Sequence, residues 1–140
     1  MRRTLAFALF ATLTAAAALA ADASVKDEMK QVVEPAANTI FSVGGDVDPA
    51  NGPDAAKVPP ARWAEAASAA HALQGVATAL NGPQKQPGDE WTKAAGDFAK
   101  LAADAENAAK KTDGAGLSKA ANDLGDVCTA CHSKYKKQGG

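Results

Sequence analysis

The sequence predicts an all-α protein, an antiparallel four-helix bundle, and three observations lead to it. Alanine supplies much of the 46% of hydrophobic residues while aromatic residues make up only 5%, a composition that favours helices packed through small side chains. Four segments repeat apolar residues at spacings of three and four, and none shows the sustained period-two alternation of a strand. The connections, two short and one longer, favour antiparallel neighbours, and a chain of 140 residues favours a single domain.

The first residues are predicted to lie outside the bundle. A positive start, MRR, precedes an apolar run, and residues 21–23 (ADA) offer a small-x-small cleavage pattern, with residues 18–20 (ALA) as a rival. This is the pattern of a secretory signal peptide over residues 1–23, which is cleaved, so the domain is predicted as residues 24–140. A membrane anchor is the alternative, but no long apolar run follows. Free thiols rarely persist outside the cytoplasm, so an exported chain must oxidise its cysteines, bind a metal with them or use them covalently.

The first helix is predicted from about Ser24 to Phe41. Ser24, followed by Asp27, is a suitable N-terminal cap. Pro35 falls inside the pattern and predicts a kink, because it cannot donate to the carbonyl of Gln31. Residues 42–58 are rich in Gly, Pro and Asp and are predicted to form the longest connection. The predicted inward stripe comprises Val25, Met29, Val32, Ala36 and Ile40.

The second and third helices follow the same logic. The second begins at the Pro59-Pro60 pair, which suits a first turn, and runs to about Leu80. The third begins at Asp89, predicted as its cap. The second carries Trp63, Ala66, Ala70, Leu73, Ala77 and Leu80 on its inward stripe, and the third carries Trp91, Ala95, Phe98, Ala102, Ala105 and Ala109.

The fourth helix carries both cysteines of the chain on its apolar seam. With Cys128 at 0°, Cys131 lies near about 300° and His132 near about 40°, so the three share an arc of about 100°. Two thiols and an imidazole on one arc can reach two vinyl groups of a porphyrin and its iron, the arrangement of the C-x-x-C-H haem-attachment motif. The full seam is Leu117, Ala121, Leu124, Cys128, Cys131 and Tyr135.

Three other uses of this motif are less well supported. A redox dithiol normally begins a helix after a strand, where the helix dipole lowers the thiol pKa. A disulfide between residues three apart in a helix would be strained. A zinc site needs four ligands, and the other histidine of the chain is His71. The sequence therefore predicts one covalent haem c near one end of the bundle, with His132 as an iron ligand.

Met29 is predicted to be the second axial ligand of the iron. In an antiparallel bundle the first helix starts at the end where the fourth finishes, and Met29 and His132 each lie about five or six residues from that end, at similar height. His71 is a rival ligand, and an open sixth position is another alternative. A further alternative is that Met29 fills the core, as most methionines on helix stripes do. Trp91 is predicted to pack on the porphyrin, with a place in the ordinary core as its alternative.

The segment VCTACHSKYKK, residues 127–137, near the end of an alanine-rich four-helix chain, resembles the class II cytochromes c, that is, cytochrome c′ and its low-spin, methionine-ligated relatives. In that resemblance Cys128 and Cys131 are the thioether cysteines and His132 is the proximal ligand. The segment MKQVVEPAA is similar to the family's first helix, with Met29 at the position of the low-spin members' methionine. The resemblance implies a homodimer as one arrangement.

The predicted function is one-electron transfer in the periplasm through a haem with His/Met ligation, without enzymatic activity. The alternative is a five-coordinate haem protein that binds nitric oxide or carbon monoxide. Periplasmic or membrane-bound redox proteins are the expected partners, and the mature chain is not expected to span a membrane. A net charge of −1 argues against nucleic-acid binding. Lys134, Lys136 and Lys137 could meet haem propionates or an acidic partner, or simply stabilise the helix C-terminus.

Overall fold

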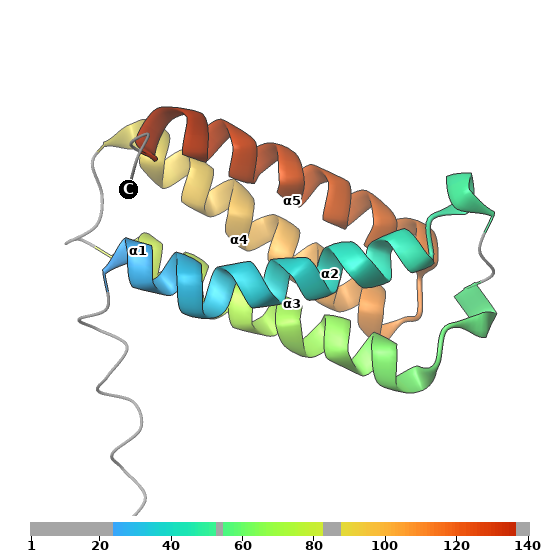
Figure 1. Ribbon diagram of the computed structural model, residues 1–140. Coiled ribbons are helices and arrows are strands. Elements are labelled where there is room, and N and C mark those ends of the chain that lie inside the picture. Colours follow the sequence, from blue (N-terminus) through green and yellow to red (C-terminus); the bar gives the residue numbers. More distant parts are fainter. Residues whose placement is uncertain (1–23, 53–54, 83–87, 137–140) are drawn as a thin grey trace, which may run out of the picture.

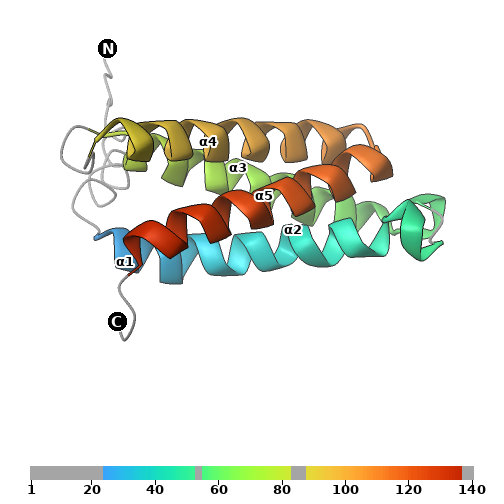
Figure 2. The same ribbon diagram turned by 90° about the horizontal axis from the view of Figure 1, so that it is seen from above.

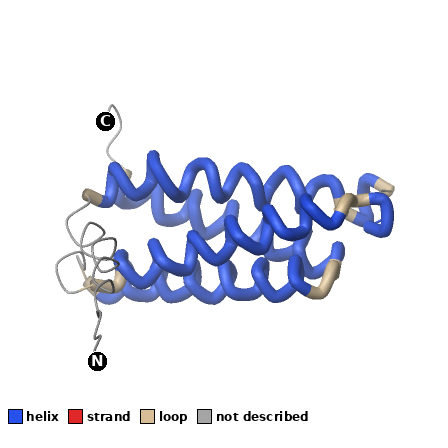
Figure 3. The backbone as a smooth tube through the Cα atoms, turned by 90° about the horizontal axis from the view of Figure 1, so that it is seen from below, coloured by secondary structure: helices blue, strands red, loops and turns tan. Residues whose placement is uncertain are grey.

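The computed structural model describes residues 24–52, 55–82 and 88–136, so the predicted signal peptide lies outside the described residues. Within these ranges every regular element is a helix and no strand is present (Figure 3). No helix in the described ranges has the length and apolar character needed to cross a membrane. The main elements are α1 (Val25–Glu28), the π-helix η1 (Met29–Val33), α2 (Glu34–Asp46), α3 (Pro60–Leu80), α4 (Asp89–Lys110) and α5 (Gly114–Tyr135).

The helices form the antiparallel four-helix bundle that the sequence predicts. α1, η1 and α2 follow one another as a single rod, which packs on α3 and α5, and α4 packs on the same two helices from the opposite side (Figures 1 and 2). The start of the rod, the start of α4 and the end of α5 meet at one end of the bundle. The two 3₁₀ turns η2 (Pro49–Asn51) and η3 (Ala55–Lys57) lie at the other end.

The bundle core is built largely from alanine. Every residue of the predicted stripes on α3 and α4 is buried, and the largest side chains that are fully enclosed are Ile40, Leu73, Leu117, Leu124 and Val43. Small side chains let helices approach closely, so much of the contact is made by backbone and methyl groups. Helical periodicity is therefore confirmed as the right guide to the core of α3 and α4.

Two helix starts differ in how well they were predicted. The Ser24 hydroxyl accepts a hydrogen bond from the Asp27 N–H at 3.2 Å, as predicted for an N-cap. The predicted N-cap of α4, Asp89, is wrong by one residue. Gly88 occupies the N-cap position with a φ of 132°, and Asp89 is in the first turn. An acidic side chain in the first turn is still favourable, since it faces the positive end of the helix dipole.

The first helix is longer than predicted, ending at Asp46 instead of Phe41. The Gly-Gly pair at 44–45 suggested the start of a connection, but both glycines are helical. Gly44 is needed where α2 crosses α5, because a Cβ built on it would lie 2.8 Å from the Cβ of Ala121. The absence of a side chain at Gly44 is thus a packing requirement within the helix.

The predicted disturbance at Pro35 takes the form of a π-helix in the turn before it. The Glu34 N–H donates to the carbonyl of Met29, five residues back instead of four. Pro35 has no N–H to offer the carbonyl of Gln31, so the regular α-helical ladder cannot pass through this turn. The predicted inward stripe is wrong at Val32, which is only partly buried, whereas Val33 is buried. Val33 lies seven residues before the buried Ile40 and so shares its face.

The glycine pair of α2 provides a matched test of helix packing. Gly44→Ala should lower the free energy of unfolding by about 1–3 kcal/mol, because the new methyl overlaps Ala121. Gly45→Ala is the control, since a Cβ there meets no atom within 4 Å and should stabilise the helix by about 0.5–1 kcal/mol. Urea unfolding followed by circular dichroism measures both, and equal effects of the two substitutions would contradict the close contact.

Candidate functional site

The predicted site residues come together in one pocket at the end of the bundle where η1, α4 and α5 meet. Its volume is about 50 Å³. η1 contributes Met29, α4 contributes Trp91, and α5 contributes Cys128, Cys131 and His132. Apolar side chains complete the wall: Val33, Leu80, Ala94, Ala95, Phe98 and Val127.

The two thiols belong to an environment unlike that of a redox dithiol. Burial raises the pKa of the Cys128 thiol, and the neighbouring Cys131 raises it further. Burial also raises the pKa of Cys131. A reactive dithiol needs a lowered pKa, so these cysteines are poor nucleophiles for thiol–disulfide exchange. They are free cysteines, without a disulfide between them.

The imidazole of His132 is at the solvent-exposed rim of the pocket. Its position on α5, one residue after Cys131, puts it on the arc that the helical repeat predicts. Among the described residues no group of three or more His, Cys, Asp and Glu side chains could hold a metal ion. The donors gathered in this pocket are therefore one imidazole, one thioether and two thiols, a set suited to a haem group.

Trp91 closes the pocket and joins the ends of three helices. Its indole is buried, and its Nε1–H donates to the carbonyl of Leu80 at 2.9 Å. That carbonyl is among the last of α3, which have no partner within their own helix. The ring of Tyr135 meets the indole edge to face, with ring centres 5.0 Å apart and planes at 81°. The orientation of the indole is thus fixed by α3 on one side and α5 on the other.

The lysines after the motif have different surroundings. Lys134 forms an ion pair with Glu90 of α4, and its ammonium lies 5.8 Å from the centre of the Tyr135 ring. Lys136 is exposed, and Lys137 lies outside the described residues. Lys134 therefore ties the end of α5 to the start of α4, which supports the structural interpretation of this charge.

His71, the rival iron ligand, is not brought to the pocket. It is exposed on α3, where its Nδ1 lies 3.6 Å from a carboxylate oxygen of Glu106 on α4. Hydrogen bonds from Lys110 and then Gln74 hold the pKa of Glu106 below its usual value. His71 thus belongs to a polar cluster between α3 and α4.

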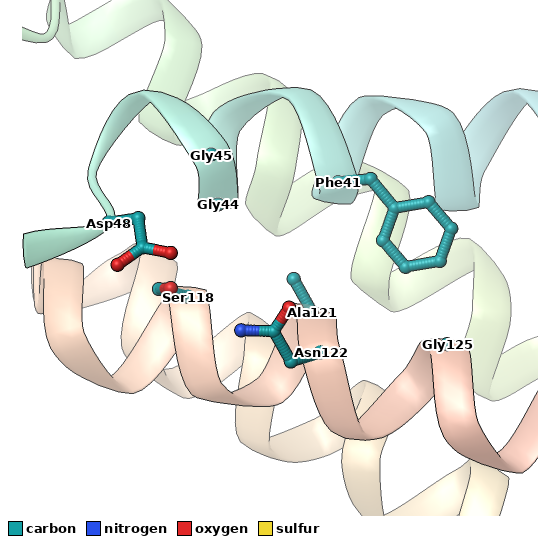
Figure 4. Close-up of a pocket in the computed structure, with 8 residues that line it drawn as sticks. All are labelled: Phe41, Gly44, Gly45, Asp48, Ser118, Ala121, Asn122 and Gly125. Carbon is teal, nitrogen blue, oxygen red and sulfur yellow. The ribbon is translucent and has the colours of Figure 1, made fainter. Parts of the chain in front are cut away.

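A second hollow lies between α2 and α5, away from the cysteines, and has a volume of about 310 Å³ (Figure 4). Small residues form its floor where the two helices cross, and Phe41 stands exposed at one side. Asp48 also lines the hollow, and its carboxylate accepts a hydrogen bond from the Ala50 N–H at 2.8 Å. Its lining residues include no thiol or imidazole, so the site chemistry is concentrated in the first pocket.

Sequence reasoning did not single out three residues of the pocket, namely Val33, Ala94 and Val127. Ala94 and Val127 each precede a predicted inward residue, and a wide apolar face includes such neighbours. Val33 lies seven residues before Ile40 and therefore on the same face of a regular helix, but the predicted stripe ran through Val32 instead.

A model of the cytochrome c′ family matches residues 85–136 of the chain. No curated protein and no solved structure matches it. The matched range contains α4 and α5 and therefore Trp91, Cys128, Cys131 and His132, while Met29 lies outside it. That family carries a covalently bound haem, and the apolar wall, the paired thiols and the imidazole of this pocket fit such a group.

Trp91 gives a test of how the pocket end is held together. Trp91→Phe keeps an aromatic ring but leaves the Leu80 carbonyl without its donor, so it should lower the free energy of unfolding by about 1–3 kcal/mol. Trp63→Phe, the same exchange at the buried tryptophan near the other end of α3, is the control for lost ring area. Chemical unfolding measures both. A smaller loss for Trp91→Phe than for Trp63→Phe would contradict this role of the hydrogen bond.

Proposed function

We propose that this chain, which residues 85–136 identify as a member of the cytochrome c′ (class II cytochrome c) family, is a periplasmic one-electron carrier. Its haem would be held by Cys128 and Cys131 and ligated by His132 and Met29. The observation that carries the proposal is the single pocket in which η1 brings Met29 to the cysteines and histidine of α5. Export by the predicted signal peptide fits haem c, which is attached outside the cytoplasm.

Each side chain of the pocket has a definite task in this proposal. The thiols of Cys128 and Cys131 would bond covalently to the porphyrin, so that the group cannot dissociate from α5. His132 and Met29 would supply the protein's ligands to the iron. When bound, the haem supplies reversible one-electron chemistry at its iron.

The apolar wall has its own effect on this chemistry. Leu80, Trp91 and Phe98 exclude water from the interior side of the pocket. A low-dielectric wall disfavours extra charge on the iron, and a methionine ligand stabilises the reduced state, so both raise the reduction potential. The hydrogen bond from Trp91 to Leu80 and the contact with Tyr135 keep this wall rigid. Rigid surroundings suit electron transfer, because little reorganisation accompanies it.

Partners follow from the same pocket. His132 and Cys131 lie at the exposed rim, so the haem edge would face solvent on the α5 side, where a periplasmic or membrane-bound redox protein can approach. Lys136 stands exposed beside this rim. A cation near the haem edge favours a partner with an acidic surface. Without Met29 ligation, the same pocket would instead bind nitric oxide or carbon monoxide at a five-coordinate iron.

Met29→Ala distinguishes the two functions. The purified wild-type protein should show a low-spin ferric spectrum with the methionine–iron charge-transfer band, and Met29→Ala should lose the band, become high-spin and bind carbon monoxide readily. Val32→Ala is the control, since Val32 is a partly buried neighbour of Met29 in the same turn. A high-spin wild-type spectrum that Met29→Ala leaves unchanged would replace the carrier with the gas-binding function.

A further inference from the structure

The π-helix η1 changes which side chains of the first helix face the bundle. In an unbroken α-helix with Ile40 at 0°, Met29 would lie at about −20°, Lys26 at about +40° and Glu28 at about −120°. In such a regular helix Lys26 would face the core and Glu28 would face solvent. The structure has the reverse arrangement, with Lys26 exposed and Glu28 only 7% exposed.

One extra residue in the turn accounts for this reversal. A π-turn closes its hydrogen bond over one residue more than an α-turn, so every residue before it rotates by about +100° relative to a regular helix. Glu28 then lies at about −20°, Lys26 at about 140° and Met29 at about 80°. These angles agree with the burial of Glu28, the exposure of Lys26 and the partial burial of Met29.

The rotation turns Met29 toward α5. On the same scale Gly44 lies at about 40°, and a Cβ on Gly44 would touch Ala121 of α5. Asp46 lies on the opposite side at about −120°, and it forms an ion pair with Arg62 of α3 at 3.1 Å. Positive angles therefore face α5, the helix that carries His132.

We propose that η1 is the positioning element for Met29, an underwound turn whose extra residue directs the thioether toward α5 and so into the haem pocket. The inference rests on the proposed function only in taking Met29 as the iron ligand. Pro35 favours this geometry, because the α-helical bond from residue 35 to Gln31 cannot form. Glu28 before the turn and Ala36 after it are both buried, as the rotated register requires.

Deleting or inserting one residue in η1 tests this proposal, because a π-turn can absorb the loss of one residue but not the gain of one. Deletion of the exposed Gln31 removes the extra residue and returns an α-helix with both flanking faces unchanged, so Met29 should keep its place. Insertion of one alanine after Gln31 cannot be absorbed in that way. It moves each earlier residue by one position, so that Lys30 takes the place of Met29.

The methionine–iron charge-transfer band reports ligation in each variant, since the haem remains attached to α5 through Cys128 and Cys131. We expect the band in the wild type and in the Gln31 deletion, and its loss in the insertion. Lys30→Met combined with Met29→Leu in the insertion background should restore it. Gln31→Ala, with the length unchanged, is the control for the side chain itself.

A second readout separates failure of the proposal from failure of the proposed function. Met29 is the only methionine after residue 1, so its ¹³C-labelled methyl group gives one NMR signal, strongly shifted by the haem wherever the methyl lies over it, whether or not it binds the iron. The shift should persist in the Gln31 deletion and vanish in the insertion. That pattern of NMR shifts without the charge-transfer band would contradict the proposed electron carrier with His/Met ligation but would support the positioning role of η1.

The opposite result would overturn the inference. The Gln31 deletion could lose both the charge-transfer band and the shifted NMR signal, and Glu28→Met in that background could restore them. The position of the ligand would then depend only on its number of residues from the bundle core, and η1 would have no positioning role. Equal tolerance of deletion and insertion would overturn it as well, since Met29 would then reach the pocket independently of the turn. Circular dichroism and the absorbance of the attached haem confirm that each variant is folded and loaded.

Discussion

The helical repeat of α5 is the constraint on which both the core and the site depend. One face of this helix carries Leu117 and Leu124 in the bundle interior and, further along, Cys128 and Cys131 in the pocket. Since side chains three and four apart share a face, the packing of the first half fixes the direction of the thiols in the second. A rotation of α5 that altered the site would also pull its leucines out of the core.

The contact between Gly44 and Ala121 extends this constraint to the rest of the bundle. It sets how closely α2 can approach α5, and α2 continues directly into the turn that carries Met29. At the pocket end the packing changes from alanine to large side chains, with Leu80, Trp91 and Phe98 forming the wall. Alanine packing elsewhere keeps the helices close, and the larger residues at this end provide a broad apolar surface where a flat cofactor can lie.

Much of this arrangement could be predicted because it depends on local periodicity. The stripes of α3 and α4 and the arc of Cys128, Cys131 and His132 follow from spacing alone, since each lies within one regular helix. The cap of α4 was wrong because Gly88, with its positive φ, precedes a residue type that often serves as a cap. The prediction ends the first helix too early, because a Gly-Gly pair looks the same in a sequence whether it breaks a helix or lets a neighbouring helix approach.

Counting residues from the end of the bundle predicts the height of Met29, which lines the pocket as expected. The direction of its side chain around the helix could not be predicted in this way, because it depends on the phase of a helix interrupted by a π-turn. Pro35 indicated a disturbance but not its form, and the exposure of Lys26 and burial of Glu28 became explicable only with the extra residue.

The side chains of α5 depend on local helical spacing, whereas Met29 depends on the phase of the first helix. This difference affects how such a protein can change its function. Cys128, Cys131 and His132, the residues of α5 proposed to bind haem, follow the buried Leu117 and Leu124 along one continuous helix, so the packing of that helix sets their direction. Met29 stands beyond the turn and outside the range that matches the cytochrome c′ family. A π-turn can gain or lose a residue while the buried side chains after it, such as Ala36 and Ile40, keep their places. In the proposed function, a change at the start of the first helix would therefore alter the ligand that Met29 supplies while leaving the rest of the bundle in place.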